Sequence, residues 1–288
     1  MKQAMLTILG TAQDAGIPQP NCTCAQCKEA LTNPAKRRYA ASLAVVMPEE
    51  KTWHLIDASL DFKEQFAAVQ MQYGLEGVLM DSIFLTHAHI GHYPGLLFLG
   101  REAIGAQGVS TYVGPKLKQM LETEAPWRQL VDLGNINVKA LQAGKAVQIS
   151  EDVAIRPVEV PHRNEFSETY GFWIEGRNRK ILYIPDIDAW TAWDVNIYDA
   201  AKEADVCILD ATFHSIAEIE NMGRDYREIP HPVMTETMDR LQDLVDETDI
   251  YFTHFNHTNP AIDPCHPFTQ QVKERGFRIA EEGMQIDL

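Results

Sequence analysis

Three histidines crowd into residues 86–92, which read Thr-His-Ala-His-Ile-Gly-His. His87, His89 and His92 follow an apolar run at 82–85 and precede a segment of helical character at 93–101. On a strand-to-helix turn these imidazoles can converge on one point, and neutral imidazole is the commonest side-chain ligand for zinc and related metals. The turn therefore predicts a metal site, with a histidine-rich turn that binds nothing as the alternative.

Further candidate ligands follow other predicted strands. His162, Asp186 and His254 each come directly after a stretch with strand character. A single histidine in such a place is usually an ordinary surface or core residue. Several of them in one chain, joined by an aspartate, instead favour a metal centre at one sheet edge, because a rigid scaffold can present ligands there from several strands.

A second cluster of metal-ligating side chains lies near the N-terminus. Three of the five cysteines, Cys22, Cys24 and Cys27, fall within a tight knuckle at about residues 21–28. An odd total with this clustering is a poor disulfide framework, whereas three thiolates can hold zinc in a reducing compartment. The fourth ligand must come from elsewhere, and an unligated cysteine cluster is the alternative. Cys207 lies in an apolar run and is expected to be a small core residue.

The predicted elements alternate between strands and helices. Strands are expected near residues 6–10, 43–47, 53–57, 82–85, 111–114, 170–175, 180–184, 206–209 and 249–253, with antiparallel strands within 135–160 and a last strand pair at the C-terminus. Helices are expected at 61–73, 115–124, 190–204, 231–245 and 268–274, and a charged loop at 223–229. With no internal repeat and no long linker, the pattern predicts a layered α/β sandwich in a single domain, residues 1–288.

Net charge and hydropathy limit the kinds of partner that this protein is expected to bind. The formal net charge is −16, which disfavours nucleic acid and anionic membranes, because phosphate binding depends on clustered Lys and Arg. No apolar run approaches the roughly 20 residues of a transmembrane helix, and residues 1–5 lead into a strand-like stretch rather than a signal peptide. We therefore expect a cytoplasmic protein with a small-molecule substrate. Two possibilities stay open: a signal peptide that was removed before residue 1, and a homodimer.

The histidine turn resembles the first motif of the metallo-β-lactamase superfamily, T-H-x-H-x-D-H, and the later ligands of that superfamily match His162, Asp186 and His254 in order. The resemblance implies the αββα fold, with an active site at one edge of the sandwich. It also implies a first metal held by His87, His89 and His162, and a second held by His92 and His254, with Asp186 bridging the two.

Gly91 departs from the superfamily motif. The aspartate that the motif has at this position binds the second metal and can handle the proton of the attacking water, and glycine can do neither. We therefore expect a weaker second site, with one metal or a partly occupied pair.

A narrower resemblance, to the PqqB family of pyrroloquinoline quinone biosynthesis, covers nearly the whole chain. It rests on residues 9–12 with the cysteine knuckle, and on the segments 161–169, 184–188, 224–232 and 254–260. PqqB proteins of the pathway commonly have a degraded first motif, whereas this chain keeps three histidines. That difference favours a PqqB-like hydrolase.

PhnP-type phosphodiesterases resemble the chain in both proposed metal centres. In them a structural zinc is held by the cysteine knuckle and by a histidine that corresponds to His257 here; Cys265 and His266 are the rival fourth ligands. By the same analogy, His231 would lie over the substrate as a proton donor, and a helix-start residue without chemical role is the alternative. Arg163, next to a proposed ligand, would meet an anionic substrate group or form a surface ion pair.

We predict a metal-dependent hydrolase in which a metal-activated water attacks an ester, with Asp186 and His231 as catalytic residues. A phosphodiester is the first substrate class, and a lactone or another ester the next. The structural site is expected to hold zinc, and the active site one or two ions of zinc, manganese or iron. The alternatives are a redox enzyme acting on a pyrroloquinoline quinone precursor and a non-catalytic carrier of such a molecule.

Overall fold

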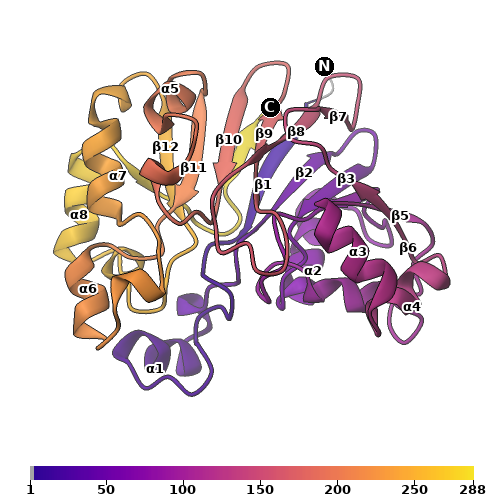
Figure 1. Cartoon of the computed structure of the whole chain (residues 1–288), viewed down its shortest axis with the longest axis horizontal. Helices are drawn as coiled ribbons and strands as arrows, with labels where there is room; N and C mark the ends of the chain where they lie inside the picture. Colours follow the sequence, from indigo (N-terminus) through magenta and orange to yellow (C-terminus); the bar gives the residue numbers. More distant parts are fainter. Residues whose placement is uncertain (1–2) are drawn as a thin grey trace.

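The computed structural model describes residues 3–288. Two seven-stranded sheets pack face to face, and helices cover the outer face of each sheet, as the two halves of Figure 1 make visible. The predicted αββα sandwich is therefore confirmed. Residues 1 and 2, which belong to the predicted N-terminal lead into the first strand, lie outside the described residues.

The first sheet is mixed. Its strands are β1 (Met5–Gly10), β2 (Ser42–Met47), β3 (Thr52–Ile56), β4 (Ser82–Phe84), β5 (Val109–Val113), β6 (Ile136–Ala140) and β14 (Gln285–Asp287). Their spatial order is β14-β1-β2-β3-β4-β5-β6, antiparallel as far as β3 and parallel from β3 to β6. Because β3 and β4 run parallel, the residues that follow them meet at one edge of the sheet.

The second sheet is also mixed. Its strands are β7 (Val147–Gln148), β8 (Ala154–Glu159), β9 (Tyr170–Glu175), β10 (Lys180–Ile184), β11 (Val206–Asp210), β12 (Asp249–Thr253) and β13 (Arg278–Ile279). Their spatial order is β13-β12-β11-β10-β9-β8-β7, parallel from β10 to β13 and antiparallel from β7 to β10. The ends of β10, β11 and β12 therefore lie side by side.

Helices enclose both sheets. The first sheet is covered by α2 (Phe62–Tyr73), α3 (Pro115–Thr123) and α4 (Trp127–Asp132), and the second by α5 (Ile197–Lys202), α7 (Met234–Leu241) and α8 (Pro267–Glu274). Two further helices are α1 (Ala25–Thr32) and α6 (Ile216–Asn221). Short 3-10 helices occupy Pro34–Lys36, Pro94–Leu99, Trp190–Ala192, Tyr226–Glu228, Gln242–Leu244 and Pro260–Ile262.

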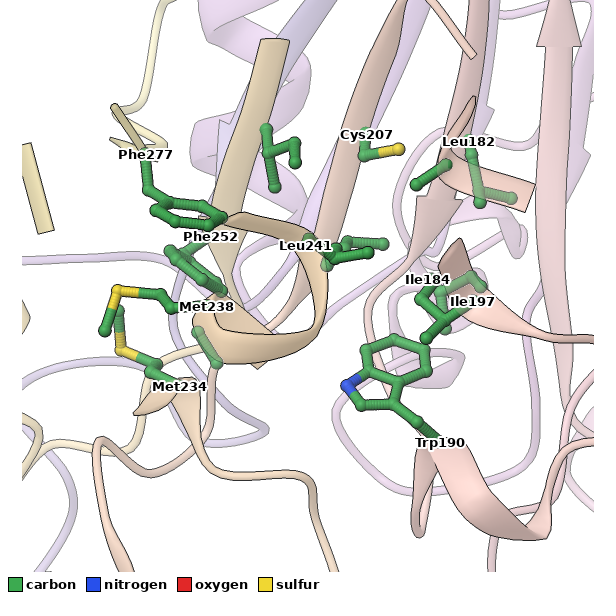
Figure 2. Close-up of a cluster of buried hydrophobic side chains, with 14 of the residues drawn as sticks. Leu182, Ile184, Trp190, Ile197, Cys207, Met234, Met238, Leu241, Phe252 and Phe277 are labelled. Carbon is green, nitrogen blue, oxygen red and sulfur yellow. The ribbon is translucent and has the colours of Figure 1, made fainter. Parts of the chain in front are cut away.

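Apolar side chains fill the space between these layers. Phe84 and Phe172 are fully buried between the two sheets, where their rings make an edge-to-face contact at 6.0 Å. Burial of a side chain of this size contributes roughly 1.5–3 kcal/mol, so this layer holds the sheets together. Figure 2 shows a different apolar layer, between the second sheet and its helices, in which the rings of Phe252 and Phe277 lie next to each other. Cys207 belongs to that layer, as its apolar surroundings in the sequence predict.

Several predicted elements differ from the structure. The expected helix at 190–204 is interrupted: a 3-10 turn at Trp190–Ala192 is separated from α5, which Asn196 caps through its side chain. Within 135–160, β6 joins the first sheet in parallel and only β7 and β8 pair antiparallel. The last strands, β13 and β14, do not pair but join opposite sheets. Helix α1, which begins inside the cysteine knuckle, is not among the helices expected from the sequence.

Candidate metal centre

The candidate ligands come from the ends of strands in both sheets. His87 follows β4, His162 follows β8 and Asp186 follows β10, while His254 comes directly after β12. All four are buried, at 3% relative exposure or less. The predicted convergence at one edge of the sandwich therefore occurs, and the converging side chains come from both sheets.

The first group of ligating atoms gathers around the carboxylate of Asp186. Its Oδ2 lies 3.4 Å from Nε2 of His87, and its Oδ1 lies 3.2 Å from Nε2 of His162. Nδ1 of His89 lies 3.1 Å from the same nitrogen of His162. One atom from each of these four residues can therefore lie within 4.8 Å of the others, a spacing that fits a single metal ion.

Two further histidines lie near Oδ2 of Asp186, the oxygen that also faces His87. Nε2 of His92 is 3.9 Å and Nε2 of His254 is 3.7 Å from Oδ2 of Asp186. Asp186 thus faces both groups, as the bridging role implied by the resemblance requires. Gly91 supplies no side chain here, but Oδ1 of Asp14, a residue that the sequence reading did not select, lies 4.0 Å from Nε2 of His92.

Oxygen atoms behind the histidines fix the ring orientations. Nδ1 of His92 bonds Asp57 at 2.7 Å, Nδ1 of His162 bonds Asp188 at 2.9 Å, and Nδ1 of His254 contacts Oγ1 of Thr212 at 3.0 Å. Each contact turns the other ring nitrogen toward Asp186. Neither Asp57, at the end of a predicted strand, nor Asp188, in the segment 184–188, has a role among the sequence-based expectations; the position of Asp57 directly after β3 was the available signal.

Unpartnered buried atoms indicate that a cation fits. Nε2 of His87, His92 and His254 and Oδ1 of Asp186 are buried without a hydrogen bond among the described residues. Buried polar atoms are nearly always hydrogen-bonded, and leaving several unpaired in one place is costly. A divalent cation would satisfy these imidazole and carboxylate atoms together, so the cluster is a buried His/Asp metal site.

Electrostatics also suit cation binding. Burial alone would raise the pKa of the Asp186 carboxyl, but the neighbouring His162, His254 and His231 outweigh it and hold that pKa well below its ordinary value. Burial, followed by the nearby His92, lowers the pKa of His87 well below its ordinary value. The carboxylate is therefore ionised and His87 neutral, which are the forms that bind metals.

Two backbone positions behind the centre are strained. Asp57 and His254 adopt left-handed φ angles of 63° and 62°, which residues with a side chain seldom adopt. Asp57 bonds both Thr86 and His92 through its carboxylate, and its own N–H bonds the carbonyl of Phe84. Strain of this kind persists only where surrounding contacts hold it, and it clusters at functional sites.

His231 lies beside the centre rather than far from it. Its Nδ1 is 2.8 Å from Oδ2 of Asp210, the last residue of β11, and 3.4 Å from Oδ1 of Asp186. Against the effect of burial, Asp210 and then Asp186 raise the pKa of His231 above its ordinary value. Asp210 has no role among the sequence-based expectations. Its position at the end of a strand, on the same sheet edge as the ligands, was the available signal. His231 is therefore close enough to act at the same site.

Arg163 lies at the mouth of the centre. One of its guanidinium nitrogens lies 3.3 Å from Nδ1 of His89, and its backbone N–H points at Asp188. The side chain lines a cavity of about 450 Å³, shared with His89 and with the exposed apolar side chains of Ile90 and Phe166. An anionic group in that cavity would meet Arg163 next to the histidines.

The cysteines of the knuckle converge with a histidine from the segment after β12. Sγ of Cys22 and Sγ of Cys24 lie 3.4 Å and 3.5 Å from Nδ1 of His257, and Cys27 completes the group. Three thiol sulfurs and one imidazole nitrogen form a tetrahedral zinc set. Because His257 is three residues beyond His254, this cluster links the N-terminal loop to the metal centre.

The rival fourth ligands lie outside that cluster. Cys265 is exposed, and its backbone N–H donates to Asp263. Nδ1 of His266 accepts a hydrogen bond from the backbone of Phe268 and so caps α8. Among the described residues, His257 therefore groups with the three cysteines and neither rival does.

Comparisons with known proteins agree with this fold and site. The sequence pattern of the family described as Beta-lactamase superfamily domain matches residues 52–255. "Coenzyme PQQ synthesis protein B" of Methylococcus capsulatus is 26% identical over 313 residues, covering 99% of this chain and 100% of that protein. The protein of the same name in Methylorubrum extorquens is also 26% identical, over 98% and 99% of the two chains.

Solved structures share the whole architecture. Zn2+-bound PqqB from Methylobacterium extorquens matches with a TM-score of 0.83 at 23% identity, over 99% of this chain and 100% of that one. A diphosphatase from the PhnP family matches with a TM-score of 0.70 at 23% identity, over 99% and 97%.

The expected family is therefore confirmed by sequence as well as by fold. The matched pattern begins at β3 and ends after His254, so it spans every strand end that contributes a ligand. Among the described residues, no helix is both long and apolar enough to cross a membrane. With full-length homologues among the PqqB proteins, this chain belongs to the metallo-β-lactamase superfamily.

Proposed function

We propose that this protein is a PqqB-like, metal-dependent hydrolase that cleaves an ester with a metal-activated water. The observation that carries the proposal is the gathering of buried, unpartnered imidazole nitrogens around Asp186. Histidine imidazoles and an ionised aspartate at strand ends are the ligand set of a hydrolytic metal centre rather than of a packed core.

The residues divide into two ligand sets that share one carboxylate. A first ion would be held by His87, His89 and His162, and a second by His92 and His254, with Asp186 facing both. Zinc, manganese and iron all suit imidazole and carboxylate ligands. Such a cation, when bound, lowers the pKa of a coordinated water toward neutrality and polarises the substrate oxygen.

His231 would supply the proton that the leaving group needs. Asp210 holds its Nδ1 at 2.8 Å, which orients the ring and stabilises the protonated imidazole. Among the described residues, Nε2 of His231 has no hydrogen-bond partner, so it can donate to the leaving oxygen.

The cavity beside the first ligand set indicates the substrate class. Its volume of about 450 Å³ accommodates a small organic molecule. Arg163 supplies a positive charge at one wall, and the exposed side chains of Ile90 and Phe166 supply an apolar rim. These features support an anionic ester with an apolar group, and the structural relative from the PhnP family, a diphosphatase, makes a phosphodiester the first choice. A lactone or other ester is the second.

The cysteine cluster would hold a structural zinc. Cys22, Cys24, Cys27 and His257 supply four ligands, so no position stays open for water or substrate. Closed sites of this kind stabilise folds, and this one would fasten the loop after β1 to the segment after β12.

The proposal is tested with the zinc-loaded protein and a panel of phosphodiesters that includes bis(p-nitrophenyl) phosphate. His89→Ala should lower turnover by about 100-fold or more, because even partners behind metal ligands are commonly worth 10–100-fold. His266→Ala is the matched control, because this imidazole caps α8 outside the centre. Equal turnover by the wild type and by His89→Ala, on every ester tested, would refute the hydrolase.

The names of the sequence relatives favour one second candidate. "Coenzyme PQQ synthesis protein B" denotes a protein of pyrroloquinoline quinone synthesis, and the histidines and aspartate of this chain can hold iron as well as zinc. The iron-loaded protein would then consume oxygen in the presence of a quinone precursor. A carrier would bind the precursor without turnover. Oxygen uptake and equilibrium binding, measured on the same preparation, separate these outcomes from hydrolysis.

A further inference from the structure

Asp14 lies where a side chain at position 91 would extend. A Cβ atom on residue 91 would lie 2.5 Å from Cα and 2.6 Å from Oδ1 of Asp14, closer than such atoms approach in folded proteins. Gly91 does not have a left-handed φ angle, so backbone conformation does not require glycine there. The glycine makes room for Asp14.

The inner oxygen of Asp14 faces the second ligand set. Oδ1 is buried and has no hydrogen-bond partner among the described residues, although the side chain as a whole is 34% exposed. It lies 4.0 Å from Nε2 of His92, which is itself unpartnered, as is Nε2 of His254. Oδ2 of Asp186 is within 4.0 Å of both nitrogens. Asp14 thus approaches the second ligand set through His92, and Asp186 joins His92 to His254 in that set.

We propose that Asp14 is a ligand of a second divalent cation, together with His92, His254 and Asp186. The inference rests on the proposed metal centre and extends it, because it supplies from the loop after β1 the carboxylate that residue 91 lacks. With Asp14 the second site would have four ligands, in place of the weakened site expected from Gly91. Carboxylate and imidazole ligands of this kind suit zinc, manganese or iron.

The loop that carries Asp14 is held in place at both ends. Before it, the backbone N–H of Phe255 donates to Thr11 at 2.8 Å, and the N–H of Gln13 donates to Phe255 at 2.9 Å. After it, the cysteine cluster joins the loop to His257. Both anchors lie in the segment that carries His254, so Asp14 and His254 are positioned as one unit.

Metal counting tests the proposal without any substrate. The metal-free protein is reconstituted with Zn2+, the ions per chain are counted by elemental mass spectrometry, and their affinities are measured by calorimetry. We expect three ions for the wild type: one at the cysteines and two at the histidines. Asp14→Asn should bind one of the latter at least about 100-fold more weakly, because the neutral amide is a poor ligand.

Two further variants separate coordination from general electrostatics. Glu165→Gln removes an exposed carboxylate 3.9 Å from His89, and it should retain all three ions. Asp14→Cys should raise the preference of one site for Cd2+ over Mn2+, because thiolate is a softer ligand than carboxylate. A merely structural role of Asp14 would not change that preference.

The outcomes distinguish this inference from the proposed function. If Asp14→Asn retains the zinc content and affinities of the wild type, Asp14 is not a ligand, and the hydrolase with its histidine ligands stands. If the wild type binds no zinc beyond the cysteine site, both the inference and the proposed metal centre are overturned.

Discussion

His92 and His254 each contact a protein oxygen through Nδ1, which leaves Nε2 facing Asp186. For His92 this division fixes a proton on Nδ1 as well as the ring orientation, because the carboxylate of Asp57 can only accept a hydrogen bond. His231 follows the same rule, with Asp210 as its partner. The orientation of each histidine in this centre therefore depends on the oxygen that its Nδ1 contacts.

The proposed role of His231 predicts a dependence on the leaving group. His231→Ala should lower kcat by about 100- to 10,000-fold for a phosphodiester with an alkoxide leaving group, because proton donation is then required. For p-nitrophenolate, which leaves without protonation, the loss should be small. Steady-state kinetics on both substrates measure the difference, and equal losses would show that His231 has only a structural role.

At the scale of elements, the centre depends on parallel strands that end together. β10, β11 and β12 deliver Asp186, Asp210 and His254 in spatial order because neighbouring parallel strands share their carboxyl edge. The loop between β1 and α1 then closes over this edge and carries Asp14. Its cysteines and His257 hold it there, so this cysteine–histidine cluster supports the neighbouring site as well as the loop.

Substitution of the cysteines tests this coupling. Cys24→Ala should release one zinc ion per chain and lower Tm by at least about 5 °C, because a closed metal site contributes to folding. It should also weaken one histidine-bound ion, since Asp14 loses its anchor. Zinc analysis and thermal melting measure these effects.

Two other cysteines are matched controls for that experiment. Cys265→Ala, at an exposed position, should change neither zinc content nor Tm. Cys207→Ala should lower Tm by creating a small cavity while retaining all zinc. Full zinc content in Cys24→Ala would contradict the structural site.

At the scale of the whole molecule, the C-terminal segment fastens the two sheets. It leaves the second sheet at β13 and enters the first at β14, so residues 280–284 cross between them. Glu282 lies in this crossing and accepts a hydrogen bond from the backbone N–H of Tyr39. Burial raises the pKa of Glu282 from 4.5 to about 7, although the Tyr39 N–H and Arg38 act in the opposite direction.

This raised pKa predicts a pH-dependent stability. The folded state holds the Glu282 proton more tightly than the unfolded chain, so the contribution is full below about pH 4.5 and is lost as pH rises through about 7. In the wild type, this effect should lower the unfolding free energy by at most about 3 kcal/mol between pH 5 and 8. Glu282→Gln should abolish that decrease. Urea unfolding at both pH values measures it. The exposed Glu281→Gln is the control, and identical pH profiles for Glu282→Gln and the wild type would contradict the assignment.

Both clusters of metal-ligating side chains can be predicted from the sequence alone. His87, His89 and His92 lie within one turn, and Cys22, Cys24 and Cys27 within one knuckle, so residue type and short spacing were sufficient to predict metal ligands. Strand patterns also predicted that His162, Asp186 and His254 follow strands. The sequence also predicted the α/β fold class, because the spacing of apolar residues shows which face of each strand or helix is buried.

Contacts between residues far apart in the chain depend on the fold and could not be predicted from the sequence. Pairing of strands far apart in the chain sets Asp57 behind His92 and Asp210 behind His231, and short-range patterns carry no information about such contacts. The break at Asn196 and the crossing from β13 to β14 depend on packing for the same reason. Gly91 is the clearest case: in the sequence it is a missing ligand, and in the folded chain it is the space that Asp14 fills.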